Sequence, residues 1–452
     1  MEGGGPADAL ERAIEGRVVR PGSPDYDEAR RTYNGLIDRR PRLIARPTSR
    51  DAVAACVRYA REHGISLGVR GGGHSVAGHA IVEDGLVVDL SAMRSVTIDS
   101  QARVAHVAGG ALWCDLDPAA LVHGLGVPGG VFGDTGVAGL TLGGGIGFLM
   151  GVGGYSCDNI VGAELVTADG SIIEAAEDPD LLWALRGGGG NFGAVTRLDL
   201  ALHRVGLMYG GVVDVPLEDG GALRRWSALM REAPDELLPM MVILRDDSGT
   251  LWLQLQLAYL GDAEAGEGFA TAILGHVRHA RAGLRACTYL DIQSINAIKT
   301  FGRRHYWSST FVADLDDGLV DILVAAAETI PNGSSSLLLE PVHGAARRRG
   351  SGYAAFGNRA ARFHVTAIGT WLDPAFDEAG TAWSRSVVAG ISAWSSGSLY
   401  ANYSMPGEAA TAGPGDRARA AYPPDTFERL QSVKRRYDSG NTFRNNLNIL
   451  PG

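Results

Sequence analysis

The chain has 452 residues, 45% of them hydrophobic and 20% charged, so it can bury a large core and divide into two or more domains. Its formal net charge of -10 argues against the clustered Lys and Arg side chains that bind nucleic acid or an anionic membrane. The sequence has neither a signal-peptide pattern nor a run of about twenty apolar residues. We expect a cytoplasmic protein, and nothing in the sequence indicates its oligomeric state.

Cysteine and glycine usage points away from a metal centre and toward ligand-binding loops. The four cysteines are scattered and lack the spacing of zinc ligands, so we predict no metal and expect each to be a small buried hydrophobic residue. They are Cys56, Cys114, Cys157 and Cys287. Glycine occurs 63 times, roughly twice its usual share of about 7%. The glycines concentrate in residues 68–85, 124–154 and 187–193, which favours loops that face a ligand over disorder.

The first clear elements are a helix, a strand and a glycine loop. Apolar residues at helical spacing predict a helix over residues 48–63, which Gly64 ends. Residues 65–69 are typical of a strand, and the glycines at 71–73 follow it directly, with His74 next. Three glycines let the backbone approach a ligand closely, and their N–H groups suit a pyrophosphate.

The segment after this loop argues against a dinucleotide-binding unit of the Rossmann type. Such a unit opens a helix at the glycines, with its N-terminus toward the pyrophosphate. Residues 80–90 are instead rich in β-branched side chains and turn at Asp84 and Gly85, which predicts a strand. The next elements expected are strands at 95–98 and 103–108 and an amphipathic helix at 111–123.

A second glycine-dense stretch, residues 127–147, is too apolar for a flexible linker. The N–H groups of a buried loop need partners, so either a bound polar ligand or tight turns between packed strands accounts for it. Further on, Asp169-Gly170 is a strong turn signal that predicts a hairpin over residues 161–174. Cys157 lies just before this hairpin.

Between about residues 206 and 395 the sequence changes character, and strands alternate with helices. Residues 251–257 alternate leucine with tryptophan and glutamine, the two-residue period of a half-buried strand. The other elements expected are a strand at 209–215 and helices around Leu223, Trp226, Leu229 and Met230 and around Ile273 and Val277. This pattern predicts an antiparallel sheet with helices on one face.

Taken in order, the glycine motifs resemble those of a known flavoprotein group. The chain carries RGGGHSVAG, then TGVAGLTLGGGIG, then YSCDN before ELVTADG, then LRGGGGNFGAVT. These runs are similar to the FAD-binding half of vanillyl-alcohol-oxidase-type flavoproteins. The closing segment VKRRYDSGNTFRNNLNILP is similar to the signature of the berberine-bridge-enzyme-like oxidases within that group. The resemblance is strong over residues of about 38–200 and 390–452.

The resemblance implies an α+β, two-domain FAD-binding fold of the vanillyl-alcohol-oxidase type with an antiparallel-sheet substrate domain. We expect an FAD-binding domain over residues 1–205 and a substrate-binding domain over residues 206–398. Residues 399–452 are expected to form a C-terminal segment that returns to the FAD domain. In the resembled family, the second domain covers the isoalloxazine ring and shapes the pocket.

The resemblance also implies FAD held by two covalent bonds. In the resembled oxidases a histidine is bonded to the flavin 8α-methyl carbon and a cysteine to flavin C6, and His74 and Cys157 match these two positions. Imidazole and thiolate are both nucleophiles able to add to an electron-poor ring, although a satisfied loop histidine and a buried cysteine remain the alternatives. The other residues expected to bind FAD are Arg70, Gly71, Gly72, Gly73, Ser75, Gly136, Gly139, Thr141, Gly143, Gly144, Asn159, Val161, Asn446 and Asn448.

For the activity, the resemblance implies an oxidase that removes a hydride from a bulky secondary metabolite or a carbohydrate-like alcohol, with dioxygen as acceptor and hydrogen peroxide as product. Family members often use a tyrosine base, so Tyr400 and Tyr403 are the candidates, with a core or rim position as the alternative for each. Tyr155 could also approach the ring. Gly153 and Phe427 stand where relatives often carry an aromatic ring or a hydroxyl. These departures motivate a different hypothesis, a drug-binding or resistance protein that acts by sequestration.

Several aromatic and histidine side chains of the middle region are possible pocket residues, with core packing as the alternative. They are His305, Tyr306, Trp307, His343, His364 and Trp371.

Overall fold

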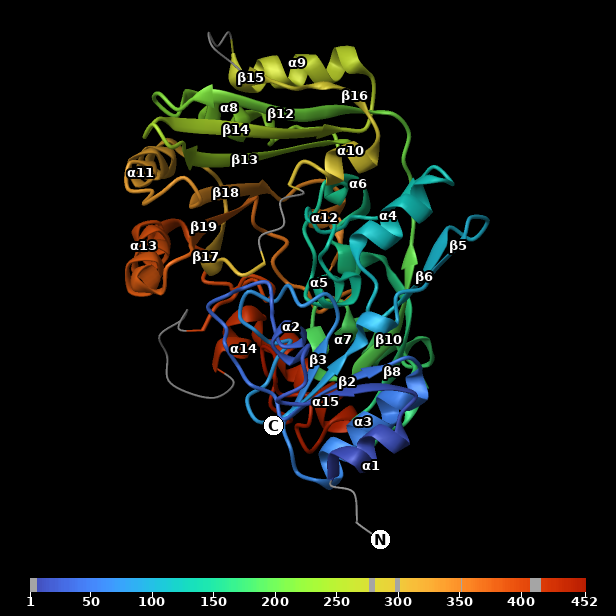
Figure 1. Cartoon of the computed structure of the whole chain (residues 1–452). Helices are drawn as coiled ribbons and strands as arrows, with labels where there is room; N and C mark the ends of the chain where they lie inside the picture. Colours follow the sequence, from blue (N-terminus) through green and yellow to red (C-terminus); the bar gives the residue numbers. More distant parts are fainter. Residues whose placement is uncertain (1–5, 276–280, 297–300, 351, 407–415) are drawn as a thin grey trace.

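The chain forms two lobes, one with small sheets and one with a single large sheet (Figure 1). The computed structural model describes residues 6–275, 281–296, 301–350, 352–406 and 416–452. Helices occur together with mostly antiparallel strands, which confirms the predicted α+β class. Within the described ranges, no helix is long and apolar enough to cross a membrane.

A four-stranded sheet with the order β1-β2-β4-β3 forms one part of the first lobe. β2, β4 and β3 run parallel, and β1 is antiparallel to β2. Helix α3 packs Val53 and Val57 against this sheet, and Ser49 caps the helix by accepting a hydrogen bond from the N–H of Ala52. The elements are α1 (Pro6–Ala13), β1 (Gly16–Val19), α2 (Tyr26–Ala29), β2 (Leu43–Pro47), α3 (Arg50–Glu62), β3 (Leu67–Arg70) and β4 (Leu86–Asp89).

The connection between β3 and β4 contains the triple-glycine loop and no α-helix. The helix predicted over 48–63 and the strand predicted over 65–69 are confirmed as α3 and β3. The strand predicted over 80–90 is confirmed only in its second half, β4, because residues 80–85 form turns and open chain. The two strands are parallel neighbours without a crossover helix, so the prediction against a Rossmann unit is confirmed.

A second, five-stranded antiparallel sheet with the order β5-β6-β10-β8-β9 completes the first lobe. The hairpin predicted around Asp169-Gly170 is confirmed as β8 and β9, and Gly170 has φ +84°, which favours glycine. Helix α4 confirms the helix predicted at 111–123. The elements are β5 (Val96–Asp99), β6 (Val104–Ala108), α4 (Trp113–Leu121), β7 (Leu125–Gly126), α5 (Val137–Leu142), α6 (Met150–Gly153), β8 (Ile160–Val166), β9 (Ile172–Glu174), α7 (Pro179–Leu185), β10 (Ala194–Ala201) and β11 (His203–Arg204).

The second lobe is an eight-stranded sheet with the order β15-β12-β14-β13-β18-β19-β17, and β16 also pairs with β12. Every pairing within it is antiparallel. The strands are β12 (Met208–Pro216), β13 (Leu237–Arg245), β14 (Leu251–Tyr259), β15 (Arg281–Ala282), β16 (Arg285–Cys287), β17 (Arg304–Val312), β18 (Ser336–Pro341) and β19 (Phe363–Trp371). The strands predicted at 209–215 and 251–257 are confirmed as parts of β12 and β14.

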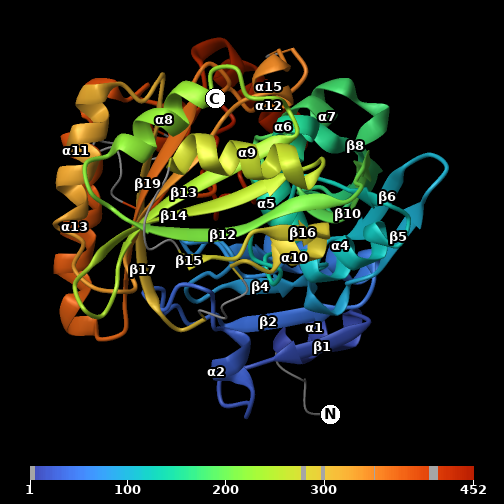
Figure 2. The same cartoon turned by 90° about the horizontal axis from the view of Figure 1, so that it is seen from above.

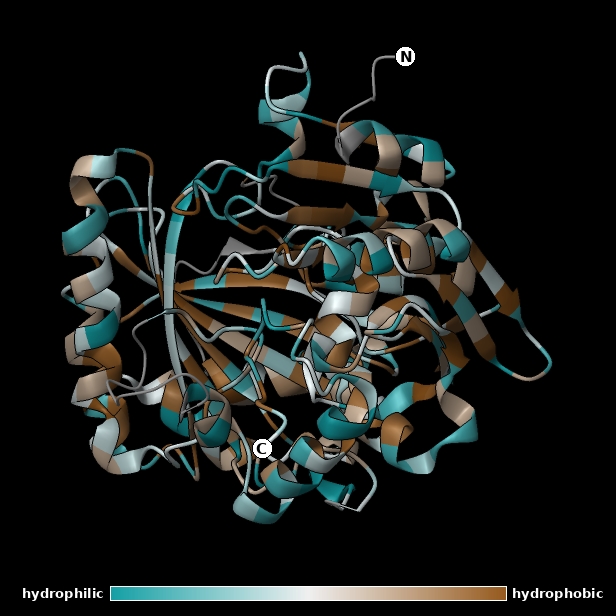
Figure 3. Cartoon of the chain, turned by 90° about the horizontal axis from the view of Figure 1, so that it is seen from below, coloured by the Kyte–Doolittle hydropathy of each residue, from teal (hydrophilic) through white to brown (hydrophobic). Residues whose placement is uncertain are grey.

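Four helices cover one face of this sheet, as the sequence predicts (Figure 2). They are α8 (Gly221–Leu229), α9 (Ala263–Leu274), α11 (Asp317–Ala327) and α13 (Asp377–Gly390). Trp226, Ile273 and Leu323 belong to the apolar core between these helices and the strands. In Figure 3 the strands are mainly hydrophobic, whereas the helices also carry hydrophilic residues. Val277, which the sequence assigns to the helix of Ile273, lies outside the described residues.

The opposite face of the large sheet turns toward the first lobe. Asn34 joins the two, because its side chain bonds the N–H and C=O of His305 on β17 at 2.8 and 2.9 Å and the C=O of Val76 at 2.7 Å. Val76 follows the triple-glycine loop in the chain. The sheet edge and that loop are therefore held together by one buried amide. The short helices α10 (Tyr289–Gln293) and α12 (Ala345–Arg348) pack against α4 and α6 of the first lobe.

The C-terminal segment contains α14 (Asp416–Ala421) and α15 (Pro424–Tyr437) and lies against the first lobe. Arg429 of α15 forms an ion pair with Asp180 of α7 at 2.6 Å, and the hydroxyl of Tyr437 donates to Asp178 at 2.6 Å. The four cysteines are free thiols. Three of them are buried as predicted, but the prediction is wrong for Cys114, which is exposed near the start of α4.

Candidate active site

A cavity of about 270 Å³ lies where the first lobe, the large sheet and the C-terminal segment meet. Glycine is its commonest lining residue. The glycines are Gly71, Gly72, Gly73, Gly109, Gly130, Gly136, Gly139, Gly143, Gly188, Gly189, Gly190 and Gly193. Three glycine-rich stretches that are far apart in the sequence therefore face one space, which favours the bound-ligand interpretation of these stretches.

Close contact between two backbone segments explains why glycine occupies these positions of the lining. A Cβ atom on Gly72 would lie 2.3 Å from the N atom of Gly136, and a Cβ atom on Gly136 would lie 2.4 Å from the N atom of Gly72. Gly73 has φ +72°, a left-handed conformation that glycine adopts without strain. At Gly139 and Gly190, which also line the cavity, an added Cβ would meet nothing within 4 Å. At these two glycines the backbone therefore faces the cavity with no side chain covering it.

The lining is electrically neutral apart from its histidines. Among the described residues that line the cavity, none is Asp, Glu, Lys or Arg. A phosphate group would therefore be held by peptide N–H groups rather than by cationic side chains. Polar atoms without hydrogen-bond partners occur in the same region, namely Asn446 Oδ1 and His79 Nε2 in the lining and Thr141 Oγ1 and Asn448 Oδ1 outside it. Narrow glycine walls and unused polar atoms fit the FAD expected from the sequence.

His74 lines this cavity, and its ring is held on several sides. Its Nε2 lies 3.2 Å from Oδ1 of Asp134, and its Nδ1 lies 3.3 Å from Oγ1 of Thr135. The ring stacks on Tyr33 with centroids 4.8 Å apart and meets Phe301 edge-on at 5.2 Å. The side chain keeps 11% of its surface exposed. The imidazole is thus fixed in place and still accessible from the cavity.

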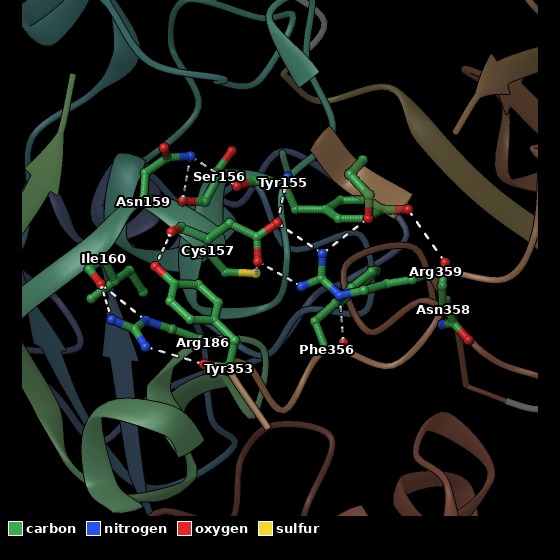
Figure 4. A network of polar contacts seen from close by, with 12 residues as sticks. Tyr155, Ser156, Cys157, Asn159, Ile160, Arg186, Tyr353, Phe356, Asn358 and Arg359 are labelled. Carbon is green, nitrogen blue, oxygen red and sulfur yellow. Dashed lines mark hydrogen bonds and ion pairs between the residues drawn. The ribbon is translucent and has the colours of Figure 1, made fainter. Parts of the chain in front are cut away.

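Cys157 has a different environment, within a polar network that includes Arg359 (Figure 4). It is not among the residues that line the cavity. Its residue is 0% exposed, its N–H donates to the C=O of Gly144 at 2.8 Å, and its Sγ lies 4.0 Å from Oδ1 of Asp158. Arg359 holds both oxygens of Asp158 at 2.8 and 2.5 Å. Burial raises the pKa of the Cys157 thiol well above its usual value. The bond from Cys157 to flavin C6 that the resemblance implies stays a prediction.

The same network fixes the backbone turn around Cys157. The hydroxyl of Tyr353 donates to the C=O of Asp158 at 2.8 Å, and Arg186 donates to the C=O of Ile160 at 3.0 and 2.7 Å (Figure 4). Tyr155 is fully buried, and its ring packs on Phe356 with centroids 4.2 Å apart. Tyr155 is absent from the lining, and its approach to the flavin ring stays a prediction.

Most of the other residues predicted to bind FAD do line the cavity. They are Gly71, Gly72, Gly73, Ser75, Gly136, Gly139, Gly143 and Asn446. Arg70, Thr141, Gly144, Asn159, Val161 and Asn448 do not. Val161 is 41% exposed on β8, and Asn159 uses its side-chain N–H groups on the C=O of Gly153 and of Tyr155 at 3.1 and 3.0 Å. For these two residues a contact with FAD stays a prediction.

The remaining four residues support the lining instead of forming it. The guanidinium of Arg70 would lie about 3.0 Å from a Cβ atom on Gly73, and it donates to the C=O of Ala29 at 2.6 Å. Thr141 lies between two lining residues in the sequence, and Gly144 has φ +126° and accepts the N–H of Cys157. A direct contact of these side chains with FAD stays a prediction.

The two candidate tyrosines are placed differently. Tyr400 is 2% exposed and absent from the lining, and its hydroxyl accepts hydrogen bonds from the N–H of Gly145 at 2.9 Å and from Asn402 at 3.0 Å. This arrangement favours the core position that the sequence left open for it. Tyr403 lines the cavity, and its ring meets Trp307 edge-on with centroids 4.7 Å apart.

Sequence reasoning missed the group behind Tyr403. The hydroxyl of Tyr403 lies 3.3 Å from Oε1 of Glu340, and Nδ1 of His364 lies 2.9 Å from Oε2 of the same carboxylate. Glu340 and His364 have side chains only 1% and 0% exposed. The sequence indicates His364 as a possible pocket residue. No sequence pattern indicates a catalytic or binding role for Glu340. The register of β18 and β19 pairs the two.

A second residue that sequence reasoning missed is Lys434, which is buried in the C-terminal segment. Its Nζ donates to the C=O of Asn191 at 2.8 Å, to the C=O of Phe443 at 3.0 Å and to Asp438 at 2.7 Å. Asn191 and Phe443 both line the cavity. One buried ammonium group therefore ties two walls of the cavity together. A lysine four residues before Asp438 gives no such signal in the sequence alone.

The other suggested pocket residues divide between the cavity and the core. Trp307 lines the cavity, and His305 stacks on Tyr33 with centroids 4.6 Å apart. Tyr306, His343 and Trp371 are buried and absent from the lining, which agrees with core packing.

The two departures from the family pattern also lie away from the cavity. Phe427 is 2% exposed and lies under the guanidinium of Arg419 at 4.8 Å. A Cβ atom on Gly153 would lie 2.7 Å from Pro128, so a larger side chain does not fit at this position. Neither residue lines the cavity.

Two family models match the chain. The one described as FAD binding domain matches residues 41–176, and the one described as berberine and berberine like matches residues 399–450. Both regions supply residues to the cavity, for example His74 from the first and Tyr403 from the second.

Similar proteins extend over nearly the whole chain. The (R)-6-hydroxynicotine oxidase of Paenarthrobacter nicotinovorans is 30% identical over 461 residues, which cover 97% of each chain. The crystal structure of 6-hydroxy-D-nicotine oxidase from Arthrobacter nicotinovorans superposes with a TM-score of 0.87 at 27% identity and covers 97% of this chain and 98% of that one. A chitooligosaccharide oxidase has a TM-score of 0.85 at 21% identity, covering 99% and 100% of the two chains, and shows likeness of fold. The fold predicted from the glycine motifs is confirmed.

Proposed function

Since the chain belongs to the berberine-bridge-enzyme-like family of FAD-linked oxidoreductases, we propose that it is an oxidase that removes a hydride from a bulky small molecule and passes the electrons to dioxygen, releasing hydrogen peroxide. The observation that carries the proposal is the arrangement of the cavity. His74, the glycine walls, Tyr403 and Trp307 all line this one cavity. A cytoplasmic location stays part of the same proposal.

We propose that FAD is held covalently through the imidazole of His74; the second bond, through Cys157, which the resemblance implies, is tested by the Cys157→Ala variant described below. The ring is accessible from the cavity and is kept from rotating by Tyr33 and by the oxygens of Asp134 and Thr135. The glycine walls and Asn446 would hold the pyrophosphate and the ribose with neutral groups. When bound, FAD supplies an acceptor for the hydride, which no side chain can provide.

The protein residues would orient the substrate and move its proton. Trp307 and Tyr403 form an aromatic wall of the cavity, with the two rings nearly perpendicular at 77°. The phenol oxygen of Tyr403 would meet the hydroxyl or amine hydrogen of a substrate lying along this wall. Because the lining carries aromatic rings and no charged side chain, we favour a ring-containing secondary metabolite over a carbohydrate-like alcohol.

The experiment is a substrate panel read by the flavin spectrum. The purified protein is mixed without oxygen with (R)-6-hydroxynicotine, 4-hydroxybenzyl alcohol or chitobiose, and flavin bleaching is recorded. We expect the ring compounds to bleach the flavin and to give hydrogen peroxide once air is admitted. Stoichiometric binding of every compound without bleaching would overturn the oxidase and favour sequestration, the hypothesis motivated by Gly153 and Phe427. The position of both residues away from the cavity removes that motivation.

A further inference from the structure

Behind Tyr403, buried in the large sheet, lies a carboxylate and histidine pair for which the proposed function gives no use. Glu340 is on β18 and His364 is opposite it on β19, so both side chains leave the same face of the sheet. That face is the one turned toward the cavity, because Trp307, which lines it, lies on the same side of the neighbouring β17. The pair is almost completely withdrawn from solvent.

Burial of an ionisable carboxylate costs free energy unless its oxygens are hydrogen-bonded. Here each oxygen of Glu340 has one partner. Oε1 lies 3.3 Å from the hydroxyl of Tyr403, and Oε2 lies 2.9 Å from Nδ1 of His364. The titratable groups that face Glu340 are His364 from β19 and Tyr400 and Tyr403 from the C-terminal segment. Tyr403 is thus the only one of these partners that also lines the cavity.

Tyr403 is poorly suited to act alone as a base. Burial and the neighbouring Glu340 raise its pKa well above the usual value of 10.0. Its phenol therefore stays protonated at neutral pH, and a protonated phenol can accept a proton only while it gives up its own. The hydrogen bond to Glu340 provides a path for that second proton.

We infer that Glu340 is the proton acceptor of the oxidation, that Tyr403 relays the proton to it, and that His364 is a positioning residue for the carboxylate. The substrate hydroxyl or amine proton passes to the phenol oxygen of Tyr403 as the phenol proton passes to Oε1 of Glu340. The C–H bond breaks, and its hydride leaves with both electrons to the flavin.

The proton and electron count balances over the full cycle. The substrate loses one proton to Glu340 and one hydride to the flavin. When dioxygen is reduced to hydrogen peroxide, it takes the two electrons and one proton from the flavin and the second proton from Glu340 through Tyr403. Glu340 is then a carboxylate again. The inference rests on the proposed oxidase function and adds the residue that stores the substrate proton.

The test uses Glu340→Gln, which keeps the shape of the side chain and removes its basicity. The compound of the panel that bleaches the wild-type flavin fastest is used, and anaerobic flavin reduction is followed between pH 5 and pH 9. In the wild type we expect the rate to fall at acid pH, as in any reaction that needs an unprotonated base. In Glu340→Gln we expect the rate to be at least about 10²-fold lower and this acid limb to be absent.

Three further variants separate a chemical role from a structural one. Glu340→Asp restores a carboxylate and should recover part of the rate together with the acid limb. His364→Gln should lower the rate by less than Glu340→Gln does and keep the acid limb, because the carboxylate remains and keeps its hydrogen bond to Tyr403. Glu164→Gln is the matched control, since Glu164 is also buried, at 5% exposure, but lies on β8 away from the cavity. It should leave the rate and the pH profile unchanged.

The outcomes distinguish this inference from the proposed function. A wild-type protein that no panel compound bleaches contradicts the oxidase itself. A wild type that bleaches while Glu340→Gln keeps its rate and acid limb overturns the relay and leaves the oxidase intact. A Glu340→Gln variant that raises KM for a cationic amine with kcat unchanged also overturns the relay, because the carboxylate would then be a docking group. The visible flavin spectrum of each variant checks that it is folded and loaded.

Discussion

The loop of His74 and the turn of Cys157 come from similar glycine-rich sequences, yet they differ in what surrounds the reactive atom. The imidazole of His74 has 11% of its surface exposed and belongs to the lining of the cavity. Cys157 is 0% exposed, and the Asp158–Arg359 ion pair lies beside its sulfur. The comparison teaches that two nucleophiles from similar motifs can differ in access and in neighbouring charge, and both properties govern the reactivity of a nucleophile.

The electrostatic surroundings point in the same direction. The carboxylate of Asp158 beside Cys157 disfavours a thiolate, and burial adds to this effect. His74 has instead the oxygens of Asp134 and Thr135 within hydrogen-bond distance, which hold a neutral or charged imidazole in one orientation. The four predictions below test this difference, beginning with the largest effect.

Replacing His74 by Ala should abolish covalent attachment of the flavin completely. The described lining residues include no cysteine and only one other imidazole, that of His79, which burial keeps neutral with a pKa lowered to about 4. The measurement is the flavin fluorescence of the acid-precipitated, washed protein, with the mass of the intact chain as a check. His79→Ala is the control and should keep the bond. A yellow pellet from His74→Ala would contradict the assignment.

Replacing Arg359 by Leu should strongly destabilise the region around Cys157. The change leaves Asp158 buried without its cation, and removing one partner of a buried pair costs about 3–5 kcal/mol of unfolding free energy. The measurement is urea unfolding followed by tyrosine and tryptophan fluorescence. Arg348→Leu is the control, because its pair with Asp235 has side chains 61% and 35% exposed and should contribute less than about 1 kcal/mol. Equal losses in both variants would contradict the comparison.

How much of this site was predictable depends on how local its signals are. The triple glycine before His74 and the Asp169-Gly170 turn are local patterns, and both predictions of structure are confirmed. The surroundings of Cys157 are not local, because Arg359 lies 201 residues from Asp158 in the chain. A sequence motif gives the position of a cysteine and says nothing of a cation that the fold brings beside it.

The same reasoning applies to the group behind Tyr403. The motif contains both Tyr400 and Tyr403, and the sequence does not distinguish them. In the structure Tyr403 lines the cavity, whereas Tyr400, three positions earlier, does not. The contact with Glu340 spans 63 residues, and the pairing of Glu340 with His364 depends on the register of two strands. A shift of one residue in that register would turn either side chain to the helix-covered face. These partners therefore required the structure.

Replacing Tyr403 by Phe should slow flavin reduction by at least about 10²-fold, because the phenol oxygen on the proton path is lost. Tyr400→Phe should mainly lower stability, by about 1–3 kcal/mol, since the N–H of Gly145 loses a buried acceptor. Anaerobic stopped-flow reduction measures the first effect and urea unfolding the second. Two variants with the same slow reduction would contradict the distinction between the cavity-facing and the buried tyrosine.

Replacing Cys157 by Ala should have the smallest effect, a loss of about 1 kcal/mol of unfolding free energy for one buried sulfur atom, and should leave the covalent flavin content equal to that of the wild type. The raised pKa of Cys157 means that its thiolate is scarce even at pH 8, because the proton leaves only as the pH approaches the raised value. Iodoacetamide at pH 8 should therefore modify the exposed Cys114 and spare Cys157 in the folded protein. Mass spectrometry of the digested protein locates both labels. Loss of a flavin bond in Cys157→Ala would mean that the sulfur reaches the cofactor despite its burial, and the contrast with His74 would no longer hold.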